Sequence, residues 1–345
     1  MTDLLLQKQP DRFDIYRRPP GLWLSPSRKR WMVTAPDLIR QVMTSDAFAV
    51  PTYDVSRLSE RLNVDLRFLN ALREWIPLAH EGERHRHLRA NFARAVTSRS
   101  DAALEGLRQA LEARRSIFSR PTGTEFCLFS DLFRPALRRA IARLSDVPLT
   151  EDLPVEVIPQ LFDDTISLTR RRRINAVLEG ISGCIPASLG EDERQTRMAV
   201  IALSANTLLG SVCQTFIEQL GQSPGRPLRD VAWGRELTRT ALPLVEKRVV
   251  KPVELGGQSL QPGDRVRLFI EAAGVSAEGR PCYDDLFFAV GPHKCVGMNV
   301  SIRAWQMVAD FCATLDCKVE LLSVSERDGD YVFNLPERIL VKLDA

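Results

Sequence analysis

The chain has 345 residues, of which 44% are hydrophobic and 26% charged, a balance typical of folded globular proteins and not of disordered ones. Lys and Arg number 47 against 44 Asp and Glu, and the net charge of +3 is too small for the concentrated basic surface of a nucleic-acid-binding protein. The one dense basic run, Arg170 to Arg173, fits a solvated helix face or a local group of salt bridges.

Membrane and secreted classes are not expected either. No stretch approaches the ~20 consecutive apolar residues of a membrane helix. The N-terminus has no basic region followed by an apolar core, so it does not resemble a signal peptide. The seven cysteines are odd in number and irregularly spaced, which indicates reduced thiols and not a disulfide framework. We therefore expect a cytoplasmic protein with neither a membrane nor a nucleic acid as its partner.

The first half of the chain predicts mostly helices. Residues 1–30 are rich in Pro and Arg and predict an extended arm, which a short strand at 30–34 follows. Ala35-Pro36-Asp37 then opens a helix. The apolar pattern from 84 to about 144 is helical, and a further helix is predicted over 155–178.

The second half begins with a long helix over about 191–220, and because it is apolar on most sides we expect it to be buried. A shorter helix after Pro227 is predicted to carry Glu236 and Arg239. The apolar period then becomes that of strands, from Val249 to Ile270.

A loop is predicted from Gly274 to Lys294, then a helix over about 296–315, then strands from Val319 to Leu343. No internal repeat or linker divides the chain. The prediction is a single domain over residues 1–345, mainly α with a small β region.

The strongest functional signal is the segment from Phe288 to Gly297, which reads Phe-Ala-Val-Gly-Pro-His-Lys-Cys-Val-Gly. It is a glycine-containing loop that delivers Cys295 to the start of a helix, where exposed amides and the positive dipole end stabilise a thiolate. Gly291 and Gly297 allow the backbone to approach a flat group. Phe288 is placed to pack against the sulfur, and His293 and Lys294 to meet an anionic group.

Two other interpretations of this loop stay open. Cys295 fits a structural cysteine beside a loop, which is what most cysteines are. A zinc site built from Cys282, His293 and Cys295 is the second alternative, but it lacks a fourth ligand and a C-x-x-C pair.

The pattern F-x-x-G-x-H-x-C-x-G resembles the haem-binding loop of the cytochrome P450 superfamily in its bacterial form. The resemblance implies a cytochrome P450-like fold with a bound haem b. It makes Cys295 the thiolate ligand of the iron, and Phe288, Gly291, His293 and Gly297 parts of the haem site.

Further matches occur in the order of that family. Glu236-Leu237-Thr238-Arg239 resembles the E-x-x-R of its K helix, where Glu and Arg form a buried ion pair; a surface pair at i, i+3 is the alternative. Arg248 resembles an arginine that reaches a haem propionate. His85 and Arg89 share a helix face and resemble the C-helix H-x-x-x-R, which also binds propionates, although a merely charged helix face would look the same.

The buried helix departs from the family pattern. Leu203-Ser204-Ala205-Asn206-Thr207 stands where A-G-x-[DE]-T is usual at the oxygen-binding groove. The resemblance makes Thr207 and Asn206 the candidate catalytic residues, but an amide cannot shuttle a proton by titrating, though it can hold a water. The alternative is that Thr207 only bonds a backbone carbonyl of its own helix. The chain is also short, and residues 270–287 lack the usual Pro- and Arg-containing meander.

The resemblance implies a monooxygenase that uses dioxygen, a small or medium organic substrate and electrons from a ferredoxin-type redox partner. Its pocket would be lined by the loop near residues 68–76 and by the buried helix around Leu203. A second hypothesis is a haem-thiolate enzyme of the dehydratase or isomerase type, or one that uses peroxide, which Asn206 favours. A third is a ligand-binding or accessory cytochrome P450-like protein.

Overall fold

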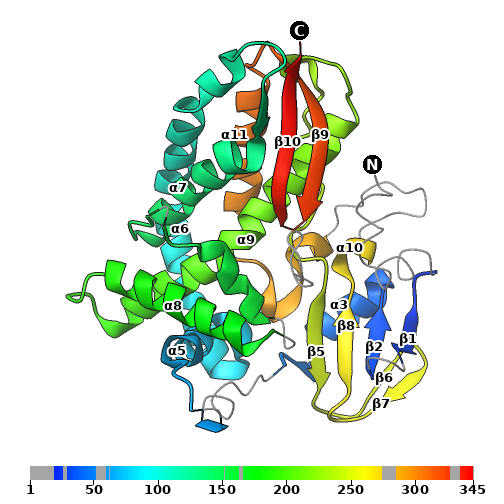
Figure 1. Cartoon of the computed structure of the whole chain (residues 1–345). Helices are drawn as coiled ribbons and strands as arrows, with labels where there is room; N and C mark the ends of the chain where they lie inside the picture. The colour runs from blue at the N-terminus through cyan, green and yellow to red at the C-terminus, as the bar shows by residue number, and fades with distance from the viewer. Residues whose placement is uncertain are drawn as a thin grey trace. The chain divides into compact units, whose positions relative to one another are not determined.

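The computed structural model describes residues 19–25, 29–51, 60–61, 63–150, 152–162, 166–273, 285–326 and 335–344. The chain forms two compact units (Figure 1). The strand unit comprises Met1–Thr52, Leu78–Gly82 and Leu242–Cys295, and the helical unit comprises the remaining residues. The prediction of one domain over residues 1–345 stays a prediction.

The strand unit is built on a five-stranded sheet with the order β1-β2-β8-β5-β3, in which only β2 and β8 are parallel. These strands are β1 Leu22–Ser25, β2 Arg30–Val33, β3 Phe48–Ala49, β5 Val245–Val249 and β8 Arg265–Leu268. The unit also holds a hairpin and two helices: β6 Val253–Leu255, β7 Gln258–Leu260, α3 Pro36–Thr44 and α10 Ile270–Ala273.

The two faces of this sheet differ because side chains alternate along a strand. One face is apolar and packs against α3 in a buried cluster that includes Val33, Ile39, Val249, Val266 and Leu268. On the other face a single carboxylate, that of Glu246, accepts hydrogen bonds from three arginines: Arg30 of β2 and Arg265 and Arg267 of β8. The charged face joins three neighbouring strands through side chains.

The helical unit contains six long helices among its described residues: α5 Arg67–Trp75, α6 Gly82–Glu112, α7 Arg134–Ser145, α8 Leu168–Cys184, α9 Glu191–Gly221 and α11 Met298–Cys312. Its sheet has the order β4-β10-β9, formed by β4 Glu125–Cys127, β9 Lys318–Glu326 and β10 Pro336–Asp344. Its shorter helical elements are the 3-10 helix η4 Val155–Phe162, the turns Arg115–Ser119 and Leu228–Asp230, and the π-helical turn Phe129–Phe133.

Helix α9 is the centre of the helical unit, and it is buried over most of its length as predicted. Figure 1 shows α7, α8 and α11 close to α9, and all three contact it. The Phe216 ring of α9 meets the Phe133 ring edge to face, with 5.0 Å between the ring centroids, and stacks on Trp233 with 5.3 Å between the centroids. By length and composition α9 is the one helix of the described residues that could cross a membrane, but 83% of its most apolar stretch is buried inside the protein.

The helix predicted over 155–178 is wrong. Residues 155–162 form η4, and α8 begins only at Leu168. Pro159 lies inside η4 and lacks the N–H that a continuing α-helix needs. Ser167 then starts a new helix as its N-cap, accepting a hydrogen bond from the Arg170 N–H at 3.3 Å.

The short helix predicted to carry Glu236 and Arg239 is also wrong. Only the turn Leu228–Asp230 is helical, and residues 231–244 have no regular secondary structure. Four of their backbone N–H groups, at residues 234, 238, 239 and 241, donate to side-chain oxygens of α9 and not to the carbonyls that a helix would use. Part of the predicted N-terminal arm is in fact β1, while residues 1–18 and 274–284 lie outside the described residues.

The aromatic contacts of α9 give a stability prediction. Phe216→Ala should lower the free energy of unfolding by about 3–5 kcal/mol, because it removes a ring that is 1% exposed and touches Phe133 and Trp233. Leu322→Ala, at a side chain 38% exposed, is the control and should change it little. Denaturant unfolding of the three proteins measures both. Equal losses in the two variants would contradict the central role of this contact.

Candidate functional site

The cysteine loop belongs to the strand unit and is fixed by its own backbone. Two short 3-10 helices, Asp285–Phe288 and Gly291–His293, precede Cys295. The Cys295 N–H donates to the Phe288 carbonyl at 2.8 Å, which closes the loop. Cys295 is exposed, unlike the buried Cys213 and Cys312. The loop therefore presents a thiol at the surface of its unit, as a ligand or nucleophile requires.

Gly291 is needed for a reason that the sequence did not reveal. Its φ is +73°, and a Cβ built there would lie 2.8 Å from the Met43 carbonyl oxygen of α3. The sequence predicted a close approach to a flat group, and the structure adds a close approach to α3. Ala289 also has a positive φ, +60°, which costs a non-glycine residue energy and is common near functional sites.

His293 points its Nε2 at a carboxylate of the same unit. Its distance to Glu81 Oε2 is 3.1 Å, and the Val50 N–H donates to Glu81 Oε1 at 2.9 Å. Burial raises the pKa of Glu81, but the bonds from His293 and Val50 outweigh it and lower that pKa to about 2. Lys247 Nζ lies 3.8 Å from the same carboxylate, and burial lowers the pKa of Lys247. The loop is thus tied to an ionised glutamate.

Arg248 lies on β5 and is half-buried. Its Nε is buried and has no hydrogen-bond partner among the described residues. An orphaned guanidinium N–H fits an anionic acceptor, because charge-assisted hydrogen bonds are the strong ones. The donor set of this unit therefore fits a haem, with a thiolate for the iron and an arginine for a propionate.

In the helical unit, α6 places His85 and Arg89 on one face, four residues apart. His85 is 3% exposed, and Arg89 is half-buried. Gly297, the last residue of the predicted loop, is the N-cap of α11, and its carbonyl accepts from the Ser301 N–H at 2.9 Å. Helix α11 thus begins at Met298, two residues later than predicted.

The two candidate catalytic residues of α9 are both engaged with backbone. The Thr207 hydroxyl donates to the Leu203 carbonyl at 2.7 Å, which is the alternative that the sequence left open. Asn206 is completely buried, and its Nδ2 donates to the Glu156 carbonyl of η4 at 2.8 Å. Its Oδ1 is buried and has no partner among the described residues. Asn206 is thus an anchor for η4 with one free acceptor.

Glu156 is a residue that sequence reasoning missed. Its side chain is 4% exposed and accepts from Arg134 Nε at 3.0 Å, with Arg138 Nη1 at 3.6 Å. Both arginines belong to α7, so Glu156 joins η4 to α7 through its carboxylate and to α9 through its carbonyl. A lone glutamate in the apolar run Val155-Glu156-Val157-Ile158 was the available signal.

No family model matches the chain, and no curated protein does. Solved structures match nearly its whole length. P450BioI, in complex with a hexadec-9Z-enoic acid-ligated acyl carrier protein, has a TM-score of 0.75 at 16% identity over 99% of this chain and 100% of that one. The TM-score is 0.73 for epothilone D-bound cytochrome P450epoK, at 16% identity over 98% and 96%. For the thermophilic cytochrome P450 from Sulfolobus tokodaii it is 0.65, at 16% over 97% and 100%.

The chain has the cytochrome P450 fold. The predicted fold class, mainly α with a small β region, is confirmed.

Within this cytochrome P450 fold the E-x-x-R segment is not a buried Glu–Arg pair. Glu236 is exposed, and Arg239 pairs with Glu218 of α9 at 2.9 Å. The predicted partnership of Glu236 with Arg239 is therefore wrong, because the segment is extended and lacks the helical spacing that would bring i and i+3 together.

The zinc alternative stays untested, because Cys282, one of its three ligands, lies outside the described residues. No group of three or more possible metal-binding side chains occurs among the residues that are described. None of the six cysteines in the described part of the chain forms a disulfide.

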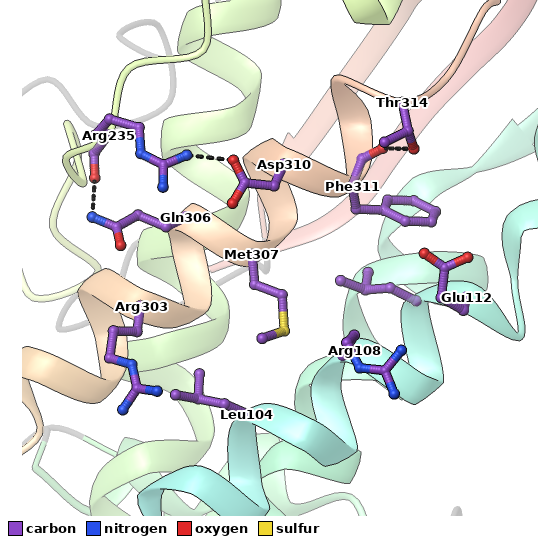
Figure 2. A pocket seen from close by; sticks show the side chains of 11 residues that line it. Leu104, Arg108, Glu112, Arg235, Arg303, Gln306, Met307, Asp310, Phe311 and Thr314 are labelled. Atoms are coloured by element: carbon purple, nitrogen blue, oxygen red, sulfur yellow. Dashed lines mark hydrogen bonds and ion pairs between the residues drawn. The ribbon is translucent and has the colours of Figure 1, made fainter.

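A groove of about 410 Å³ lies in the helical unit between α6 and α11 (Figure 2). Leu104, Leu111, Met307 and Phe311 contribute apolar side chains to it, and the charged residues along it include Arg303, which pairs with Asp101 at 2.9 Å. None of the predicted site residues lines the groove.

The buried amide of Asn206 gives a pH prediction. In Asn206→Asp, an ionised carboxyl would face the Glu156 carbonyl oxygen, so the introduced group is stable only when protonated. The pKa of the introduced carboxyl in the folded state is raised above the usual ~3.9. Its hydrogen bond to the Glu156 carbonyl is therefore fully present below about pH 4, and it is lost as the pH rises through the raised pKa. We expect unfolding free energies about 1–3 kcal/mol below the wild type at neutral pH, with a smaller difference near pH 4. Asn206→Ala is the control, whose deficit should not depend on pH.

Gly291 gives a second prediction. Placing a non-glycine residue in the left-handed conformation costs roughly 1–2 kcal/mol. Gly291→Ala should lower the free energy of unfolding by more than that, because its Cβ also meets the Met43 carbonyl. Gly257→Ala is the matched control, since Gly257 has φ +75° and open space around its Cβ position. Thermal unfolding of both variants measures the difference, and equal losses would show that the approach to α3 carries no weight.

Proposed function

We propose that this chain is a haem-thiolate monooxygenase of the cytochrome P450 type, with Cys295 as the iron ligand of haem b. The observation that carries the proposal is the loop around Cys295. The thiol of Cys295 is exposed, and the backbone N–H of the same residue donates to the Phe288 carbonyl. When bound, a haem with a thiolate ligand supplies dioxygen activation, because the thiolate donates electron density that favours O–O cleavage. The cytochrome P450 fold supports this assignment.

Four residues are proposed to hold the haem propionates: His85, Arg89, Arg248 and His293. The orphaned Nε of Arg248 is the strongest support, since a buried guanidinium N–H needs an acceptor. His293 is already bonded to Glu81, so it would share its ring between that carboxylate and a propionate. Phe288, Gly291 and Gly297 are proposed to shape the same site.

Thr207 and Asn206 are proposed to hold water for proton delivery. The Thr207 hydroxyl donates its hydrogen bond to the Leu203 carbonyl, and the Asn206 Nδ2 donates to the Glu156 carbonyl. Both side chains can therefore offer acceptor lone pairs to a water. Neither ionises at working pH, so the proton must come through the water itself.

The absence of an ionisable side chain at positions 206 and 207 favours a second candidate, an enzyme that uses peroxide in place of dioxygen and reductant. Peroxide brings its own protons, and this route asks less of Thr207 and Asn206. A substrate that already carries an N–O or O–O bond would serve in the same way, in a dehydratase- or isomerase-type reaction.

The substrate is proposed to be a small or medium organic molecule bound beside α9 and residues 68–76. The loop predicted at 68–76 is wrong, because residues 67–75 form α5. The start of α5 is held firmly, because Asn175 Oδ1 of α8 accepts from the Phe68 and Leu69 N–H groups at 3.0 and 3.2 Å. A wall anchored by two backbone bonds favours a preformed pocket. Fatty acyl chains, free and on a carrier protein, belong in a substrate screen because P450BioI was solved with such a ligand.

A ferredoxin-type protein is proposed as the electron donor, and the cytoplasm as the location. Product formed with a ferredoxin, its reductase and dioxygen, compared with peroxide alone, separates the two candidate reactions. Absence of product in both, with ligand binding retained, would favour an accessory ligand-binding protein.

Cys295→Ser tests the central assignment. The reduced carbon monoxide complex of the wild type should show the far red-shifted Soret band of thiolate ligation, and the variant should lose it, because a serine hydroxyl is not a thiolate. Cys184→Ser, at a half-buried cysteine of α8, is the control and should keep the band. A wild type that takes up no haem, or a Cys295→Ser variant with an unchanged band, would overturn the proposal.

A further inference from the structure

The segment 234–241, which follows α9 and leads into β5, is bound along one face of α9; we refer to it as the docked segment. Four of its N–H groups donate to side-chain oxygens of that helix: Gly234 to Gln219 at 2.9 Å, Thr238 and Arg239 to Thr215 at 3.0 and 3.2 Å, and Ala241 to Ser211 at 2.9 Å. The three acceptors are spaced four residues apart, which puts them on one helix face. The docked segment thus lies on α9 as an extended peptide does on a receptor.

The start of the docked segment is also held by α11. Trp305 Nε1 donates to the Gly234 carbonyl at 2.8 Å, and Gln306 Nε2 to the Arg235 carbonyl at 3.2 Å. Figure 2 shows the second bond together with the ion pair between Arg235 and Asp310. These bonds hold the beginning of the docked segment against α11. Further along the segment, the N–H groups of residues 238 and 241 donate to α9.

An ion pair between Arg239 and Glu218 lies in this later part of the docked segment. Glu218 Oε1 accepts from Nε and Nη2 of Arg239 at 3.1 and 2.9 Å. The Glu218 side chain is 14% exposed, and its Oε2 is buried with no partner among the described residues. This carboxylate depends on the guanidinium, because a buried charge that loses its partner is strongly destabilising.

We propose that Arg239 is held by Glu218 and not by Glu236, and that the pair of Glu218 and Arg239 positions the docked segment so that the protein retains haem. The inference rests on the haem binding proposed above. The docked segment continues along the chain into β5, the strand that carries Arg248 and its orphaned Nε. Glu218 and Arg239 are positioning residues, since they act through the backbone that they hold.

Three variants of the full-length protein test the assignment. Glu218→Gln removes the charge and keeps the shape, and Arg239→Met leaves the buried carboxylate unpaired. Glu236→Gln is the matched control, because it makes the same change at the exposed glutamate of the E-x-x-R sequence. The measurements are the rate of haem transfer to apomyoglobin, the fraction of the reduced carbon monoxide complex with the far red-shifted Soret band, and hydrogen exchange of the Thr238 and Arg239 amides.

We expect Glu218→Gln to speed haem transfer and the exchange of both amides about tenfold or more, the scale set by charge-assisted hydrogen bonds. Its haem-loaded fraction should also show less of the red-shifted band, which a purely structural loss would leave unchanged. Arg239→Met should be worse, and Arg239→Met combined with Glu218→Gln should recover part of the difference. Glu236→Gln should stay within about twofold of the wild type, as surface charges usually do.

Two results would overturn the inference and leave the haem proposal standing: wild-type behaviour of Glu218→Gln, or equal haem loss in Glu236→Gln. A wild type that binds no haem would defeat the proposed function, and amide exchange would still decide which glutamate holds Arg239. If Arg239→Met does not fold, Glu218→Asp, which keeps the charge, takes its place. It should lie between the wild type and Glu218→Gln, and a variant as poor as Glu218→Gln would count against the pair.

Discussion

The burial of α9 determines how the segments around it in the helical unit are held. A polar side chain on a buried helix must find its hydrogen-bond partner inside the protein, because burying it unpaired is costly. The partners that Asn206, Ser211 and Thr215 find are backbone groups of segments without α-helical structure. The same bonds satisfy those segments, whose N–H and carbonyl groups would otherwise be left without partners. Buried polar side chains on two different faces of α9 therefore hold η4 and the docked segment in shape.

The strand unit solves a similar problem with charge. Glu246 forms ion pairs with three arginines, and Glu81 contacts His293, Lys247 and the Val50 N–H. In both clusters one partly buried carboxylate joins elements that are distant in the sequence. The cysteine loop, which the proposed chemistry depends on, is attached to the second of these clusters through His293.

Features encoded by local pattern could be predicted, and features that depend on a distant partner could not. The apolar residues of α9 and the alternation in β10 identify those elements, and the Cys295 loop is legible because its glycines, histidine and cysteine are close in sequence. The docked segment looked helical because its intrinsic pattern permits a helix, but hydrogen bonds to α9 and α11 stabilise its extended form. Glu236 was chosen over Glu218 for the same reason: spacing along the chain favoured a neighbour, while the fold brought in a residue from another element.

The pairing of β4 has a consequence for the order in which this protein folds during synthesis. In its sheet β4 lies at the edge and pairs with β10 alone, with Cys127 opposite Leu340. Those two positions are 213 residues apart, which a ribosome covers in roughly 10–40 s at its usual ~5–20 residues per second. The docked segment follows α9 closely in sequence and can reach its helix almost at once, since short loops close at little entropic cost. The nascent chain thus carries an open strand edge at β4 long after α9 and the docked segment can meet, and β10 is the strand that covers this edge.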